Sequence, residues 1–111
     1  LSEPEQRTLL YTLARSENLW HQRIAIITTF AFIRAGEFED TFNIADLLLD
    51  HPHDLIHKAV GWMLREVGNR DRKAEEQFLN PRYNTMPRTM LRYAIEKFPE
   101  DLRQNYLKGR I

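Results

Sequence analysis

Apolar residues recur with a helical period along most of the chain, and polar caps and prolines divide this pattern into separate helices. Ser2 and Glu5 have the capping-box spacing, so they predict the start of a first helix. Gly36 is well placed to end a longer second helix, and Asp71 to cap a short fifth one. The seven predicted helices cover about residues 3–15, 18–36, 39–49, 52–67, 71–79, 87–98 and 99–109.

The predicted fourth helix carries its largest aromatic residue on an unexpected face. Its apolar stripe consists of Ile56, Val60, Met63 and Val67. Trp62 lies roughly 160° from Val60 around the helix, and its neighbours one turn away are Lys58 and Arg65. An aromatic ring between two cations suits a planar, anionic partner such as nucleic acid. The alternative is burial of Trp62 between helical repeats, since most tryptophans are largely buried.

The short connections between these helices predict antiparallel helix pairs. One pair follows the next after about forty residues, which is typical of HEAT-like repeats. We therefore expect an all-α chain, 1–111, with six or seven helices in a HEAT-like α-α superhelix.

Composition is that of an ordinary globular protein, with 42% hydrophobic and 29% charged residues among 111. The net charge of zero argues against a nucleic-acid binder, but it hides a split. Residues 1–55 contain four basic and nine acidic residues, whereas residues 56–111 contain twelve basic and seven acidic ones. A basic second half can form a binding face. The absence of cysteine excludes disulfides and is compatible with a cytoplasmic protein, and no membrane span or signal peptide is predicted.

Three histidines around the start of the predicted fourth helix, together with Asp50 and Asp54, superficially suggest a metal cluster. His53 and His57 have the i, i+4 spacing of zinc ligands on a helix, and His51 precedes them. The glutamate base and the third-ligand signature of such sites are missing, so we predict neither a metal nor a cofactor.

Three segments together resemble the DNA alkylation repair (AlkD-like) family of HEAT-like-repeat DNA glycosylases. They are residues 18–26 (NLWHQRIAI), 57–68 (HKAVGWMLREVG) and 86–96 (MPRTMLRYAIE). Their order and separation agree with that family over about residues 17–98, and Gly-Trp-x-Leu-Arg-Glu is the most specific part.

The resemblance implies a bacterial enzyme that binds duplex DNA and removes positively charged alkylated purines by hydrolysis of the N-glycosidic bond. It implies that Trp62 is a cleft aromatic and that Arg23 and Arg65 lie near the DNA backbone. Lys58 and Arg34 are added as candidate DNA contacts because they share helix faces with these residues. The simpler interpretation of the two arginines is a surface ion pair.

The family's catalytic aspartate lies in a Trp-Asp segment upstream of the first of these motifs. Before Asn18 the only acidic residues are Glu3, Glu5 and Glu17, and no such segment is found. We therefore interpret the chain as the C-terminal half of a larger repeat protein, and expect it to release little or no alkylated base alone. The alternative function is a non-catalytic helical scaffold that binds a protein partner or DNA.

Overall fold

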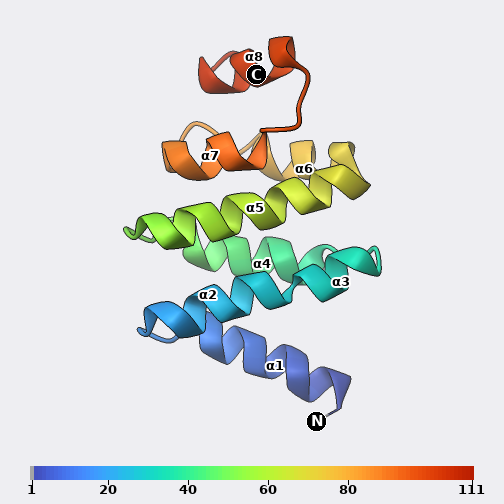
Figure 1. The fold of residues 1–111 in the computed structure, drawn as a ribbon, viewed down its shortest axis with the longest axis vertical. Helices are drawn as coiled ribbons and strands as arrows, with labels where there is room; N and C mark the ends of the chain where they lie inside the picture. Colours follow the sequence, from blue (N-terminus) through green and yellow to red (C-terminus); the bar gives the residue numbers. More distant parts are fainter. Residues whose placement is uncertain (1) are drawn as a thin grey trace.

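The computed structural model describes residues 2–111, which contain eight helical segments and no strand (Figure 1). The helices are α1 (Glu3–Ala14), α2 (Leu19–Thr28), α3 (Phe30–Arg34), α4 (Glu39–Leu48), α5 (Asp54–Arg70), α6 (Arg72–Leu79), α7 (Arg88–Ala94) and α8 (Glu100–Leu107). The all-α prediction is thus confirmed. The molecule is long and flat, with extents of 44 × 29 × 18 Å. None of the described helices is both long and apolar enough to span a membrane.

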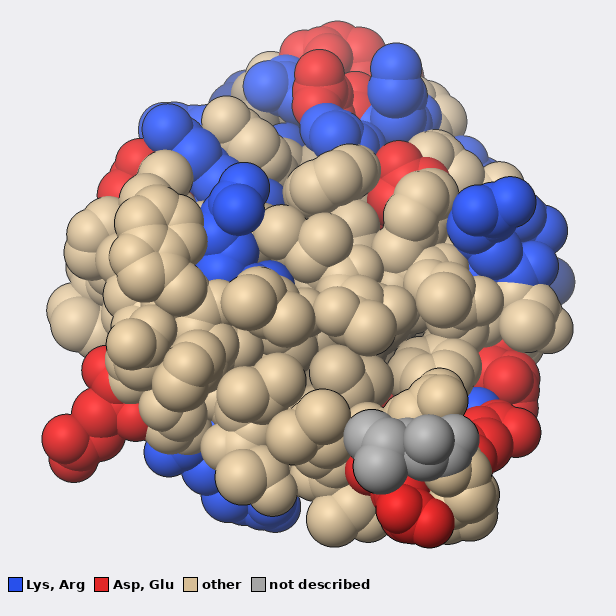
Figure 2. All heavy atoms as spheres, turned by 60° about the horizontal axis from the view of Figure 1, so that its bottom comes forward, with Lys and Arg blue, Asp and Glu red and all other residues tan. Residues whose placement is uncertain are grey.

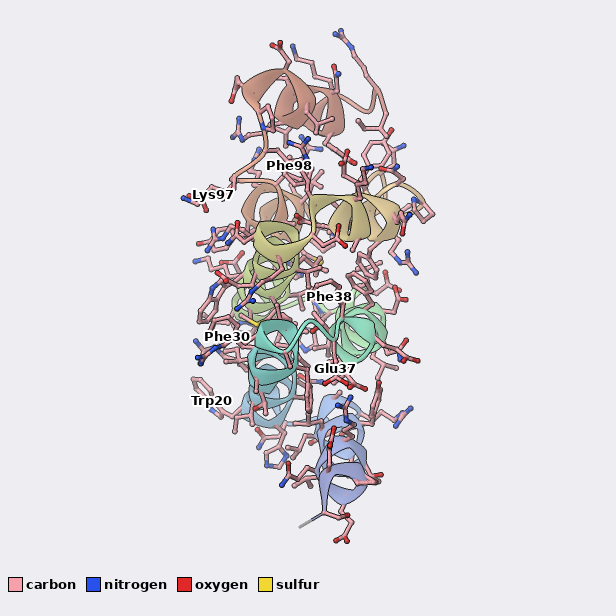
Figure 3. All side chains as sticks on the ribbon, turned by 90° about the vertical axis from the view of Figure 1, so that its right-hand side faces the viewer. Trp20, Phe30, Glu37, Phe38, Lys97 and Phe98 are labelled. Carbon is pink, nitrogen blue, oxygen red and sulfur yellow. The ribbon has the colours of Figure 1, made fainter. Side chains whose placement is uncertain are left out.

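The helices form two layers along the long axis of the molecule. One layer contains α2, α3, α5 and α7, and the other contains α1, α4 and α6, which the edge-on view of Figure 3 separates clearly. Helix α5 is central, because it contacts α2, α3 and α7 in its own layer and α4 and α6 in the other. The apolar stripe predicted for this helix is fully buried.

The predicted second helix is broken in two, which raises the number of helices above the expected six or seven. Thr29 is fully buried, and its hydroxyl donates a hydrogen bond to the carbonyl of Ile26 at 2.6 Å. Such a bond to the preceding turn bends a helix. The backbone N–H of Thr29 also bonds to Ile26 instead of residue 25, so α2 ends there and α3 starts in a new register.

The boundaries of α5 also differ from the predicted range 52–67. The helix begins at Asp54 because His53 is its N-cap, with Nδ1 accepting from the backbone N–H of Leu55. It continues past Gly68 to Arg70. Gly68 therefore does not end the helix, and the carboxyl group of Glu75 occupies the place where a side chain at position 68 would lie.

Helix α7 approaches α5 closely at Gly61. A Cβ atom on Gly61 would be 2.5 Å from Cβ of Tyr93 and 2.6 Å from the carbonyl oxygen of Met90. Only glycine allows this separation. Helix α7 itself ends at Ala94, four residues before the predicted end, although Phe98 is buried as expected.

A buried carboxylate connects α1 to α4. Asp40, at the start of α4, accepts hydrogen bonds from the guanidinium of Arg7 and, at 2.8 Å, from the hydroxyl of Tyr11. The guanidinium also lies 4.1 Å from the ring centroid of Phe32 on α3. These contacts fix α1 against α4 in its own layer and against α3 in the other.

Candidate nucleic-acid interface

Four of the five residues predicted to bind DNA line one hollow of about 210 Å³ on the α2–α5–α7 layer. Arg23 reaches it from α2, and Lys58, Trp62 and Arg65 reach it from α5. The helical count placed the last three on one face of α5, and the packing of α2 beside α5 brings Arg23 to them.

Trp62 is half-buried at this hollow, so it is neither a fully buried core residue nor a free surface residue. Its ring centroid lies 6.4 Å from that of Phe30, with the planes tilted by 43°. Phe30 projects on the side of the α2–α5–α7 layer in Figure 3. This contact holds one side of the indole and leaves part of it open to the hollow.

Arg34 is the predicted DNA contact that does not line the hollow. It is exposed at the end of α3, with its guanidinium 5.9 Å from the ring centroid of Phe30. The expectation that it shares a face with Arg23 assumed one continuous helix, and the break at Thr29 interrupts that register.

Two of the three cations in the hollow already have an acidic partner. Arg65 forms an ion pair with Glu96, and Lys58 pairs with Asp54 at 3.2 Å. The hydrogen bond from Lys58 lowers the pKa of Asp54 and keeps that carboxylate ionised. Arg23 has no ion pair among residues 2–111, so it is the cation most available to an external anion.

Several residues at this surface were not predicted from the sequence. Tyr93, Leu55 and Ala59 complete the lining of the hollow. A glycine inside a helical pattern, Gly61, could have indicated that another helix approaches there and brings Tyr93 with it. Trp20, which is 58% exposed one turn before Arg23, lies on the same side of the molecule (Figure 3).

The three histidines lie around the start of α5, and each bonds at least once to a backbone group of residues 51–55. Nδ1 of His51 accepts from the N–H of His53 at 3.0 Å, so in the neutral ring Nε2 carries the proton and donates to Gln22 at 2.8 Å. His57 Nε2 in turn contacts the carbonyl oxygen of His51. Burial, then the charges of His53 and His57, lower the pKa of His51. These bonds give the histidines structural partners near the N-terminus of α5, where His53 is the N-cap.

Fold and site together define a two-layered helical protein with an aromatic and basic hollow on one layer. The model of the DNA alkylation repair enzyme family matches residues 1–98, so the chain belongs to that family. This membership supports a role in DNA alkylation repair and implies interaction with DNA. Comparisons with curated proteins and with solved structures gave no match.

Proposed function

We propose that the protein binds duplex DNA on the α2–α5–α7 layer and takes part in hydrolytic removal of cationic alkylated purines, in the bacterial cytoplasm. The observation that supports this is the convergence of Arg23, Lys58 and Arg65 around Trp62 in one hollow. Arginine offers forked hydrogen bonds to phosphate, and an aromatic face attracts a cationic base.

The hollow is large enough to contact an alkylated base but too small to enclose it. Its volume of about 210 Å³ is smaller than the roughly 300–1,000 Å³ of sites that surround a small ligand. An N3- or N7-alkylated purine carries a positive charge, and attraction to the ring of Trp62 would contribute on the order of 0.5–2 kcal/mol. The neighbouring carboxylates of Asp54 and Glu96 are held in ion pairs. Neither is therefore assigned as the carboxylate that stabilises the sugar cation.

Two substitutions on α5 test the proposal in the full-length protein. Arg65→Ala should weaken binding to damaged and undamaged duplex equally, because a phosphate contact carries no base information. Trp62→Ala should lower excision of cationic lesions while leaving affinity for undamaged duplex nearly unchanged. Arg70→Ala, at the end of the same helix and outside the hollow, is the control. Equal behaviour of all three variants would contradict the proposal.

The two ion pairs in the hollow favour the second candidate, a helical scaffold without DNA contact at this surface. Glu96→Ala distinguishes the two functions because it frees the guanidinium of Arg65. If Arg65 binds phosphate, this variant should bind duplex DNA more tightly than the wild type. Asp101→Asn removes one exposed acid elsewhere and is the matched control for net charge. A scaffold would show no difference between the two variants.

We also propose that the chain is part of a longer HEAT-like superhelix whose further helices pack against its α1 end. Figure 2 shows a broad area without charged side chains at this end of the molecule. Its apolar residues include Leu9, Leu13, Ile24, Ala31 and Phe32. Leu9 on α1 and Leu47 on α4 are both 45% exposed, which makes them a matched pair. In the full-length protein, a cysteine at position 9 should react with a thiol reagent much more slowly than one at position 47. Equal rates would overturn this proposal.

A further inference from the structure

A second hollow, of about 260 Å³, lies at the C-terminal end of α5 and is lined largely by polar and cationic residues. Its residues are Arg65, Gly68, Asn69, Arg72, Glu75, Lys97 and Phe98. Arg65 lines the first hollow as well, so the two are neighbours. Figure 3 looks at this end of the molecule and shows Lys97 on the side of the α2–α5–α7 layer.

Glu75 is a buried acid in this hollow without a compensating hydrogen bond. The residue is 1% exposed, and its Oε2 has no hydrogen-bond partner among the described residues. Its carboxyl group sits against Gly68, where any side chain would displace it. Burial, and secondarily the charge of Glu76, raise the pKa of Glu75 to about 9, against the opposing effect of Arg65. At neutral pH the group is a carboxylic acid with an O–H to donate.

The cations around Glu75 are only partly neutralised by acidic side chains. Arg65 pairs with Glu96, and Arg72 pairs loosely with Glu76 at 3.7 Å. Lys97 is exposed and has no ion pair among residues 2–111. A neutral donor beside cations fits a ligand whose oxygens only accept hydrogen bonds, and a phosphodiester is such a ligand. Rotation about the terminal bond of Glu75 can turn either oxygen toward the hollow.

We propose that this second hollow binds a phosphate group, with the Glu75 carboxylic acid donating a hydrogen bond and Lys97 and Arg72 supplying charge. The source of that phosphate is the DNA backbone, because Arg65 connects the hollow to the surface assigned to DNA. This assignment rests on the DNA-binding function proposed above. It adds a phosphate contact beyond the aromatic hollow.

A matched pair of substitutions at Glu75 distinguishes the loss of its hydrogen bond to phosphate from a change in side-chain packing. Glu75→Gln keeps a neutral donor of the same size, so duplex affinity should stay within about twofold of the wild type. Glu75→Leu has a similar volume without a donor, so affinity should fall about tenfold while the protein remains folded. A thermal melt of both variants verifies folding. Equal affinity of the Gln and Leu variants would overturn the proposal.

Lys97→Gln provides an independent readout through the salt dependence of DNA binding. Loss of one phosphate contact should reduce the slope of log affinity against log salt by about one. Lys108→Gln, exposed beyond α8 and outside the hollow, should leave the slope unchanged. If Arg23→Ala weakens DNA binding but Lys97→Gln and Glu75→Leu do not, the phosphate site is wrong and the DNA-binding function stands.

Inorganic phosphate distinguishes a free anion from a DNA phosphate as the ligand. Phosphate should raise the melting temperature of the wild type and of Glu75→Gln, and not that of Glu75→Leu. If this holds while wild-type and variant proteins bind no duplex, the site is kept with free phosphate as its source, and the DNA-binding function fails. If phosphate changes no melting temperature and the Glu75 variants bind DNA alike, the site is overturned.

Discussion

Replacing the buried acid Glu75 by glutamine should stabilise the protein, and the gain should depend on pH. In the folded state burial raises the pKa of Glu75 to about 9, whereas in the unfolded chain it returns to 4.5. Above pH 4.5 the unfolded chain is therefore ionised while the folded protein still holds the proton. Stability from this group is complete below pH 4.5 and is lost progressively as the pH rises toward 9.

The magnitude follows from the two pKa values. Each pH unit above 4.5 costs the wild type about 1.4 kcal/mol of unfolding free energy, until the folded pKa is reached. At pH 7 the accumulated cost is about 3 kcal/mol, and near pH 9 it is about 6 kcal/mol. Glutamine has the shape of the neutral acid and no ionisation. The Glu75→Gln protein should therefore match the wild type at pH 4.5 and exceed its stability by about 3 kcal/mol at pH 7.

Denaturant unfolding of both proteins between pH 4.5 and 9 measures this difference directly. Glu17→Gln is the control, because Glu17 is exposed between α1 and α2 and does not line the hollow that holds Glu75. Its stability should run parallel to that of the wild type at neutral and alkaline pH. If the gain from Glu75→Gln is constant across the range, the carboxyl group is not held neutral and the reasoning is refuted.

Three further predictions concern the packing and caps. Gly61→Ala should lose about 1–3 kcal/mol in urea unfolding, because its Cβ would collide with Tyr93, and an unchanged midpoint would argue against the close α5–α7 contact. Asp40→Ala should lose about 1–2 kcal/mol in urea unfolding, because Tyr11 loses its buried acceptor while Glu3 and Glu37 still pair with Arg7, and an unchanged midpoint would mark the contact as dispensable. Because the pKa of His51 is lowered in the folded state, the neutral ring contributes to folding stability above pH 6.5. This contribution is lost as the pH falls below 6.5. His51→Asn, which keeps an acceptor without titrating, should flatten the fall in melting temperature from pH 6.5 to 5, and an unaltered slope would exclude the histidine.

Local polar signals made three of the helix starts predictable. Ser2, Asn18 and Asp71 cap the helices that follow them, because a short side-chain oxygen can accept from a free backbone N–H. The break at Thr29 was not predictable in this way, since it depends on a buried hydroxyl bonding back to the helix. The end of α5 was misplaced at Gly68 because a mid-helix glycine that admits another side chain looks the same in sequence as a terminator.

The candidate site was predicted best where it depends on a single helix. Lys58, Trp62 and Arg65 are brought together by the periodicity of α5 alone, and the resemblance to the repair family added Arg23. Tyr93 was missed because its place is set by the crossing of α7 over α5, which no local pattern describes. Whether these residues bind DNA stays a prediction.

Glu75 shows which sequence signal could have been followed further. Within α6 the buried residues are Glu75, Phe78 and Leu79, with the i, i+3, i+4 spacing of a helix face turned toward the core. An apolar residue at position 75 would complete that stripe and would avoid the cost of burying an acid. A residue that destabilises the fold at its position is expected mainly at sites of binding or chemistry. The cations of Arg65, Arg72 and Lys97 in the same hollow supply that reason if a phosphate binds there, because the acid then becomes a satisfied donor. If Glu75→Leu gains stability without losing affinity for any phosphate, the acid has no such use, and its burial is only a cost to the fold.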